Sequence, residues 1–204
     1  MTIACVFPGQ GSQTVGMLAA LADAYPEVGE TFAIASQALD YDLWQLTQQG
    51  PESELNRTDR TQPAMLAAGV AVWRVWQKRQ GAQPACLAGH SLGEYTALVC
   101  ADALDLAAAT RLVAERGRYM QEAVPAGQGA MAAILGLEDE QVRAVCDQAA
   151  QGEVVSAVNL NSPGQVVIAG NSSAVGRAVD IAKQSGLNRL AISTQPKERD
   201  GGRK

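Results

Sequence analysis

Residues 87–95, LAGHSLGEY, contain the spacing G-x-S-x-G, with Gly89, Ser91 and Gly93 at the fixed positions. This pattern places a serine on a sharp turn between a strand and a helix and exposes its hydroxyl as a nucleophile. The alternative is a serine that caps the following helix. A serine nucleophile needs a base to take its proton, and that base is usually a histidine. The sequence contains one histidine, His90, directly before Ser91.

His90 is a poor candidate for this base. Neighbouring residues of an extended strand point to opposite faces, so we expect His90 to be buried beside the turn while Ser91 faces outward. A base must lie within about 2.6–3.2 Å of the hydroxyl with suitable aim. Glu94 and Asp102 are too weakly placed to serve. The motif therefore predicts a nucleophile without its base.

A second glycine-rich turn, FPGQGSQ at residues 7–13, follows a short apolar segment. Phosphate binding is one interpretation, but neither G-x-x-x-x-G-K-[ST] nor G-x-G-x-x-G is present. A better one is that Gln10 donates an amide hydrogen bond to an anionic intermediate. Arg116, in AERGRYMQ, is either a solvated helix charge or, beside a nucleophile, a bidentate partner for a substrate carboxylate.

Residues 1–124 alternate strands with helices, which predicts α/β layering. IACVF (3–7) reads as a first strand, and PACLAGHS (84–91) as a central parallel strand covered on both faces. In the helix TQPAMLAAGVAVWRVWQKRQ, Pro63 fits the first turn. The apolar face of that helix is predicted to contain Leu66, Val70, Trp73 and Trp76. The remaining helices are predicted at about 16–24 and 29–39, and across 92–103 and 104–124.

Residues 125–193 predict a separate lobe. Their strands and helices follow the order β-α-β-β-α-β, which is the ferredoxin-like unit, and NSPG is a turn signal between the middle strands. The final segment, 194–204, has no large apolar residue and crowds charges beside two glycines, so we expect a disordered tail.

Composition excludes several classes of function. The net charge is −5 and the charges are scattered, which argues against a nucleic-acid-binding face. No long apolar run predicts a membrane span, and the N-terminus lacks the features of a signal peptide. The four cysteines lack C-x-x-C spacing, so we expect no metal site, but buried free thiols in a reducing cytoplasm.

Several linked segments resemble the malonyl-CoA:acyl carrier protein transacylases of bacterial fatty-acid synthesis. They are FPGQGSQTVGM, RTQPAM, GHSLGEYTALVCADAL, ERGRYMQEAVPAGQGAM and NLNSPGQVVIAG. The resemblance extends to about residue 193. It implies an α/β-hydrolase-like large subdomain, incomplete in this chain, with an inserted ferredoxin-like small subdomain.

The resemblance also implies a reaction. Ser91 takes malonyl from coenzyme A, and the pantetheine thiol of acyl carrier protein then takes it from the serine. Gln10 and the backbone N–H of Leu92 match the oxyanion hole, and Arg116 matches the arginine that binds the malonyl carboxylate. Gln62 matches a motif residue near the pocket. Coenzyme A enters as part of the substrate and phosphopantetheine belongs to the carrier protein, so the resemblance implies no cofactor and no metal.

In this family the base histidine follows the small subdomain, and no histidine follows residue 193 here. We therefore interpret the chain as truncated, expect turnover to be impaired, and expect exposed apolar surface around the first strand and the Ser91 strand. Two alternatives remain open. One is a non-catalytic remnant or fragment that binds coenzyme A or acyl carrier protein. The other is a serine hydrolase, although a carboxylate-binding arginine would not help it with neutral esters.

Overall fold

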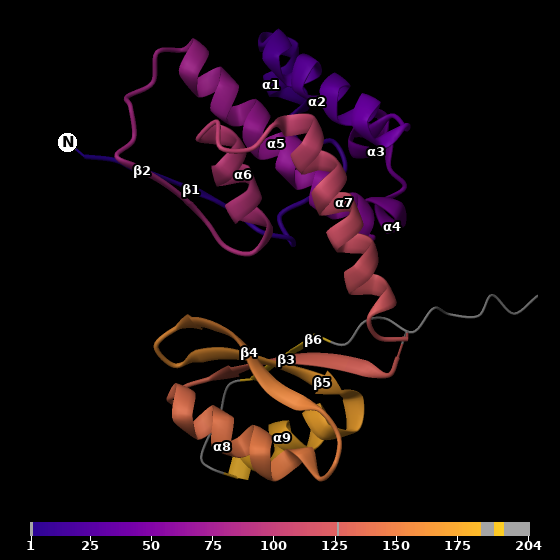
Figure 1. The fold of residues 1–204 in the computed structure, drawn as a ribbon, viewed down its shortest axis with the longest axis vertical. Helices are drawn as coiled ribbons and strands as arrows, with labels where there is room; N and C mark the ends of the chain where they lie inside the picture. Colours follow the sequence, from indigo (N-terminus) through magenta and orange to yellow (C-terminus); the bar gives the residue numbers. More distant parts are fainter. Residues whose placement is uncertain (1, 126, 185–189, 194–204) are drawn as a thin grey trace, which may run out of the picture. The chain divides into compact units, whose positions relative to one another are not determined.

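The computed structural model describes residues 2–125, 127–184 and 190–193. The chain divides into two compact units, Met1–Ala123 and Val124–Lys204, and each is described by itself (Figure 1). The tail expected to be disordered, 194–204, lies outside the described residues. Within the described ranges, no helix is both long and apolar enough to cross a membrane.

The first unit contains a short parallel sheet and a set of helices. Its elements in chain order are β1 (Ala4–Phe7), α1 (Ala19–Ala24), α2 (Pro26–Leu39), α3 (Leu43–Gln49), α4 (Glu52–Leu55), α5 (Thr58–Lys78), β2 (Cys86–Gly89), α6 (Leu92–Cys100) and α7 (Leu106–Glu122). Strand β1 pairs with β2 in parallel, with Phe7 opposite Gly89. Because parallel strands end at the same edge, the glycine-rich loop after β1 and the serine turn after β2 emerge side by side.

Helix α5 is the centre of the first unit, because buried residues lie on two of its faces. One face packs with Phe7, Leu92 and Val113. The other face presents alanines to α2, α3 and α4, where Phe32 and Leu55 are fully buried. Alanine side chains occupy little volume, so neighbouring helices can approach α5 closely.

Two details predicted for α5 are wrong. Pro63 is inside the helix rather than in its first turn, because the helix begins at Thr58. Trp76 is 41% exposed, whereas Leu66, Val70 and Trp73 are buried as predicted.

The expectation that the Ser91 strand is covered on both faces is also wrong. Leu87 packs toward the core, but Cys86 and Ala88 are exposed, and in β1 Val6 is 74% exposed. In the described part of the first unit the sheet has two strands, and its core cluster lies on one face. The exposed apolar surface expected at these strands is therefore present.

The second unit has the predicted order of elements: β3 (Gly129–Leu135), α8 (Asp139–Ala150), β4 (Val155–Ser162), β5 (Gln165–Asn171), α9 (Ser172–Gln184) and β6 (Leu190–Ser193). The strands form an antiparallel sheet in the order β4-β5-β3-β6. Figure 1 shows α8 and α9 together on one face of this sheet, where Ile134, Val142 and Ile168 are fully buried. Pro163 and Gly164 form the predicted turn, with Gly164 at φ +72°.

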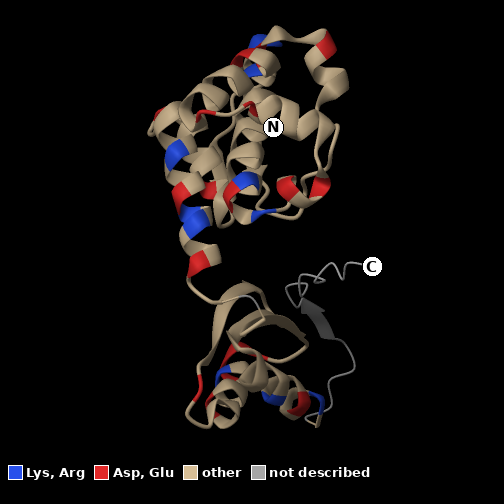
Figure 2. Cartoon of the chain, turned by 90° about the vertical axis from the view of Figure 1, so that its right-hand side faces the viewer, with Lys and Arg blue, Asp and Glu red and all other residues tan. Residues whose placement is uncertain are grey.

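Charges are interspersed on both units. Figure 2 shows Lys and Arg beside Asp and Glu along the helices. Several of these charges form local pairs, such as Arg118 with Glu115 and Glu122 on α7, and Arg143 with Glu140 on α8. Such alternation is typical of solvated helix faces and does not produce a basic surface.

Candidate active site

Ser91 occupies the strand–turn–helix context that the G-x-S-x-G spacing predicts. It lies between β2, which ends at Gly89, and α6, which begins at Leu92. Its backbone has φ +54° and ψ −112°, a region that side-chain-bearing residues rarely adopt. Such strain costs about 1–3 kcal/mol and is typical of functional sites held by the surrounding structure.

Two glycines allow this turn to exist. A Cβ on Gly89 would lie 2.0 Å from the carbonyl carbon of Gly93, and a Cβ on Gly93 would lie 2.1 Å from the Phe7 carbonyl oxygen. These distances are far inside van der Waals contact. The turn therefore closes only because both positions lack a side chain, and this closure places the end of β1 against the start of α6.

Helix capping is excluded as the role of Ser91 in this structure. Ser91 is the residue before the first turn of α6, but its side chain makes no capping hydrogen bond. The Ser91 hydroxyl is exposed and accepts a hydrogen bond from Arg116 instead. Its side chain thus contacts α7 through Arg116 and does not cap the helix that it precedes.

Arg116, on α7, lies against the serine rather than in solvent. Its Nη2 donates to Ser91 Oγ at 3.0 Å, and its Nη1 donates to Gln62 Oε1 at 2.7 Å. Its guanidinium carbon lies 5.7 Å from the centre of the Tyr95 ring, within the range of a cation–π contact. Arg116 therefore places a positive charge directly beside the hydroxyl of Ser91, the predicted nucleophile.

Gln62 is fully buried on α5. Besides accepting from Arg116, it donates through Nε2 to the sulfur of Met120 at 3.3 Å. The approach of α7 to α5 depends on Gly117, because a Cβ there would lie 2.6 Å from the backbone of Asp59. The family resemblance implied that Gln62 lies near the pocket, but its two contacts were not predicted, since they join residues more than fifty positions apart.

Gln10 lies on the loop after β1, and Leu92 is the first residue of α6, directly after the serine turn that follows β2. Gly9, next to Gln10, approaches the His90 carbonyl, since a Cβ on Gly9 would lie 3.3 Å from that oxygen. The N–H groups of Gly93 and Glu94 donate back into the turn, whereas the Leu92 N–H has no acceptor among the described residues. The Gln10 side chain is exposed and makes no hydrogen bond within the same ranges. Their oxyanion-hole roles stay predictions.

The burial expected for His90 is wrong. His90 is exposed, and within the described residues its side chain contacts neither Ser91 nor another polar group by hydrogen bond. Leu87 and Gly89 are half-buried, while Cys86, Ala88 and His90 alternate onto the exposed face. His90 contributes to the turn through its backbone, because its carbonyl accepts the Gly93 N–H.

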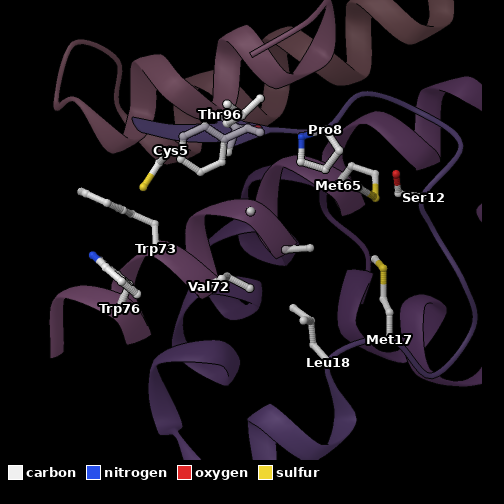
Figure 3. A pocket seen from close by; sticks show the side chains of 14 residues that line it. Cys5, Pro8, Ser12, Met17, Leu18, Met65, Val72, Trp73, Trp76 and Thr96 are labelled. Carbon is white, nitrogen blue, oxygen red and sulfur yellow. The ribbon is translucent and has the colours of Figure 1, made fainter. Parts of the chain in front are cut away.

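A mainly apolar cavity of the first unit is separate from this cluster. It has a volume of about 430 Å³ and lies between β1 and α5, where Figure 3 shows Cys5, Val72, Trp73 and Trp76 among its lining side chains. None of Gln10, Ser91, Leu92 and Arg116 lines it. The chemistry predicted from the sequence therefore belongs to the exposed serine turn and not to this cavity.

The cysteines only partly follow the sequence expectation. All are free thiols, and Cys100 and Cys146 are buried as expected. Cys86 is exposed because it lies on the open face of the short sheet, whereas Cys5 is half-buried and packs against the core on the other face. Burial, with smaller contributions from Cys5 and Asp102, raises the pKa of the Cys100 thiol to about 12. No group of three or more His, Cys, Asp or Glu in the described ranges is placed to hold a metal ion.

Comparison with known proteins gives consistent results. Residues 4–195 match the acyl transferase domain family. The chain is 64% identical over 186 residues to the malonyl CoA-acyl carrier protein transacylase of Escherichia coli K12, a match that covers 91% of this chain and 60% of that protein. The corresponding protein of Haemophilus influenzae is 61% identical over 194 residues, covering 93% of this chain and 62% of the relative.

Solved structures agree with these matches. An acyl carrier protein S-malonyltransferase from Vibrio cholerae superposes with a TM-score of 0.91 at 60% identity, covering 96% of this chain and 64% of that one. A malonyl-transacylase in complex with a type II polyketide synthase acyl-carrier protein gives a TM-score of 0.90 at 59% identity, covering 95% and 62%. The chain thus spans about 60% of the length of the curated relatives that it matches.

Proposed function

The chain belongs to the acyl transferase domain family, and on this basis we propose that it transfers malonyl from malonyl-CoA to the pantetheine thiol of acyl carrier protein through a Ser91 acyl-enzyme. The observation that carries the proposal is the 3.0 Å contact between Arg116 Nη2 and Ser91 Oγ. It places a permanent cation beside a strained, exposed serine. The relatives from Escherichia coli and Haemophilus influenzae are named malonyl CoA-acyl carrier protein transacylases, which agrees with this transfer.

The first half of the reaction forms the acyl-enzyme. Ser91 Oγ attacks the thioester carbonyl, an Oγ–C ester bond forms, the C–S bond breaks, and coenzyme A leaves as the thiol with the proton that the serine lost. Negative charge develops on the carbonyl oxygen during the attack. The Leu92 N–H, which has no acceptor among the described residues, and the Gln10 amide are the donors proposed to stabilise it.

The second half regenerates the serine. The pantetheine thiol of acyl carrier protein attacks the ester carbonyl, the Oγ–C bond breaks, and the thiol proton returns to Ser91 Oγ. Malonyl passes from one thioester to another without loss of its free carboxylate. Malonyl-CoA and acyl carrier protein are therefore the proposed partners.

Arg116 supplies the proposed selectivity for an acidic acyl group. The free carboxylate of a malonyl ester is separated from the ester carbonyl by a single methylene, so it stays close to Ser91 Oγ. A guanidinium already at hydrogen-bond distance from that oxygen can move onto the carboxylate with little displacement. A bidentate arginine–carboxylate pair is among the stronger hydrogen-bonded contacts in proteins. A neutral ester gains nothing from it, which argues against a general hydrolase.

The finer fold assignment is part of the same proposal. The antiparallel strand order β4-β5-β3-β6 with two helices on one face supports a ferredoxin-like small subdomain. The parallel pair β1-β2 followed by a serine turn supports an α/β-hydrolase-like large subdomain. A cytoplasmic location is proposed from the four free thiols.

A second candidate function is binding of coenzyme A thioesters or acyl carrier protein without transfer. It is favoured by one observation. Among the described residues, Ser91 Oγ makes a hydrogen bond with Arg116 but with no group that could accept its proton, and the exposed His90 side chain makes no hydrogen bond with it. An arginine guanidinium keeps its proton and cannot act as the base.

Intact mass spectrometry after incubation with malonyl-CoA tests the proposal. We expect a malonyl adduct that is absent in Ser91→Ala and that disappears when acyl carrier protein bearing a pantetheine thiol is added. A folded chain that binds malonyl-CoA but forms no adduct would support the second candidate. An adduct that persists in Ser91→Ala would show that another residue is the nucleophile.

A further inference from the structure

Gln62 stands out among the polar residues of α5 because it is fully buried and both ends of its amide are used. Its oxygen accepts from Arg116 Nη1 at 2.7 Å, and its nitrogen donates to the Met120 sulfur at 3.3 Å. Neither contact is to Ser91. We propose that Gln62 is a positioning residue that holds Arg116 against Ser91 and thereby sets the selectivity for acidic acyl groups. This inference rests on the function proposed above.

The two contacts of the amide fix which way it points. An amide flipped by half a turn would direct its NH₂ group at the guanidinium, and two donors would then face each other. The Met120 sulfur is a weak acceptor and suits the nitrogen but not the oxygen. Met120 therefore favours the orientation in which the Gln62 oxygen faces Arg116.

The guanidinium is held in turn on more than one side. Nη1 is bonded to Gln62 while Nη2 is bonded to Ser91, so rotation about the bonds of the guanidinium would break one or both contacts. Because the planar group of Arg116 is already fixed before the substrate arrives, its side chain loses less conformational entropy when the substrate binds. The cation is thus aimed at the serine before any carboxylate is bound.

Burial makes the Gln62 contact costly to lose. In a buried place a donor left without an acceptor keeps its desolvation penalty, and the penalty is larger for a charged donor. Removing the Gln62 oxygen would leave Nη1 unpaired, and Arg116, which is half-buried, could relieve this by turning toward solvent. The cation would then leave Ser91.

Two substitutions separate position from charge. In Gln62→Met the acceptor is lost and a side chain of similar length remains. In Gln62→Glu an oxygen keeps the same reach, but its negative charge competes with the substrate carboxylate for Arg116. Thr61→Val is the matched control, because Thr61 is the adjacent residue, is equally buried, and donates to the Leu55 carbonyl at 2.6 Å.

The first readout needs no acyl donor. In the full chain labelled with ¹⁵N-arginine, a restrained guanidinium gives separate Nη signals, and the Arg116 signals are assigned by their absence in Arg116→Lys. We expect separate signals in the unsubstituted chain, in Gln62→Glu and in Thr61→Val, and averaged signals in Gln62→Met. Separate signals in Gln62→Met would overturn the inference.

The second readout is the preference for malonyl-CoA over acetyl-CoA, measured as the ratio of dissociation constants and, where adducts form, as the ratio of adducts. We expect the preference to fall by about tenfold or more in Gln62→Met and in Gln62→Glu, and to be unchanged in Thr61→Val. An unchanged preference in Gln62→Met overturns the inference. If the unsubstituted chain itself has no preference, the proposed function fails and takes the selectivity role with it, while the guanidinium signals still decide whether Gln62 positions Arg116.

Discussion

Arg116 and Ser91, twenty-five positions apart on α7 and at the start of α6, are joined by a 3.0 Å hydrogen bond in which the guanidinium donates to the serine hydroxyl. The bond occupies the serine oxygen with a cation while leaving the hydroxyl exposed. It therefore joins the proposed nucleophile to the arginine that is proposed to bind the free carboxylate of the acyl group. A substrate carboxylate can replace Ser91 Oγ as an acceptor for Arg116, so that no buried donor is left unpaired.

Arg116→Ala is expected to shift the acyl preference from malonyl toward acetyl thioesters. A hydrogen bond to a charged group contributes about 1.5–3 kcal/mol, so the malonyl-to-acetyl ratio should fall by about 10-fold to 150-fold. The ratio is measured by competition between equal concentrations of malonyl-CoA and acetyl-CoA. Arg116→Lys should be intermediate, because an ammonium keeps the charge but loses the planar fork. An unchanged ratio in Arg116→Ala would mean that the carboxylate is bound elsewhere.

Gly93→Ala is expected to destabilise the first unit and displace the serine turn. The new methyl group would lie 2.1 Å from the Phe7 carbonyl oxygen, and backbone atoms cannot yield as a flexible side chain can. We expect a loss of about 3 kcal/mol in the free energy of unfolding, measured by urea denaturation.

Gly29→Ala is the matched control for this substitution. Gly29 is inside α2, and a Cβ there would meet no atom within 4 Å. Alanine should therefore stabilise the helix by about 0.5–1 kcal/mol. If Gly93→Ala proves as mild as the control, the turn is more adaptable than its contacts indicate.

Local patterns predicted the parts of the site that lie within one loop or one helix. The G-x-S-x-G spacing was sufficient for the strand–turn–helix context of Ser91, because the glycines are required by contacts within the motif and with β1. The β-α-β-β-α-β order of the second unit followed from periodicity and turn residues in the same way. The family resemblance singled out Arg116, whose location against Ser91 the structure then supplied.

Features that depend on distant elements could not be predicted. The contacts of Gln62 with Arg116 and Met120 require that α5 and α7 cross at Gly117, and no local pattern encodes that crossing. The prediction that β2 is covered on both faces was wrong for the same reason. An apolar strand is covered only where another element lies over it. The error on His90 followed from the error on β2. The start of α5 was predicted wrongly from Pro63. Proline is common in the first turn of a helix, but in α5 it lies inside the helix.

Thiol reactivity should follow burial rather than position in the sequence. At pH 7.5 Cys86 is expected to react first with N-ethylmaleimide, since it is exposed. Burial raises the pKa of the Cys100 and Cys146 thiols, so their reactive thiolate forms are scarce at this pH, and both should react only after unfolding. Intact mass against time gives the order, and Cys86→Ser identifies the fast site. In Cys86→Ser, rapid labelling of any thiol other than that of half-buried Cys5 would contradict the burial of Cys100 or Cys146.

The open cavity between β1 and α5 should bind apolar dyes. Val6 is 74% exposed and Trp76 41% exposed, and both line the cavity of about 430 Å³. Exposed apolar surface of this kind promotes association, and a charged residue on a strand edge opposes it. Val6→Lys is therefore expected to lower both the fluorescence of bound 8-anilinonaphthalene-1-sulfonate and light scattering on concentration. Its effect on the free energy of unfolding should stay within about 0.5 kcal/mol, because the side chain is already mostly in solvent.

Val154→Lys is the control for Val6→Lys, since Val154 is 68% exposed but belongs to the second unit and does not line the cavity. It adds the same charge, so any effect on solubility that comes from net charge alone will appear in both variants. Dye fluorescence should fall in Val6→Lys and remain in Val154→Lys. Equal falls in the two variants would show that the dye responds to overall charge, and the cavity would then not be the apolar surface that limits solubility.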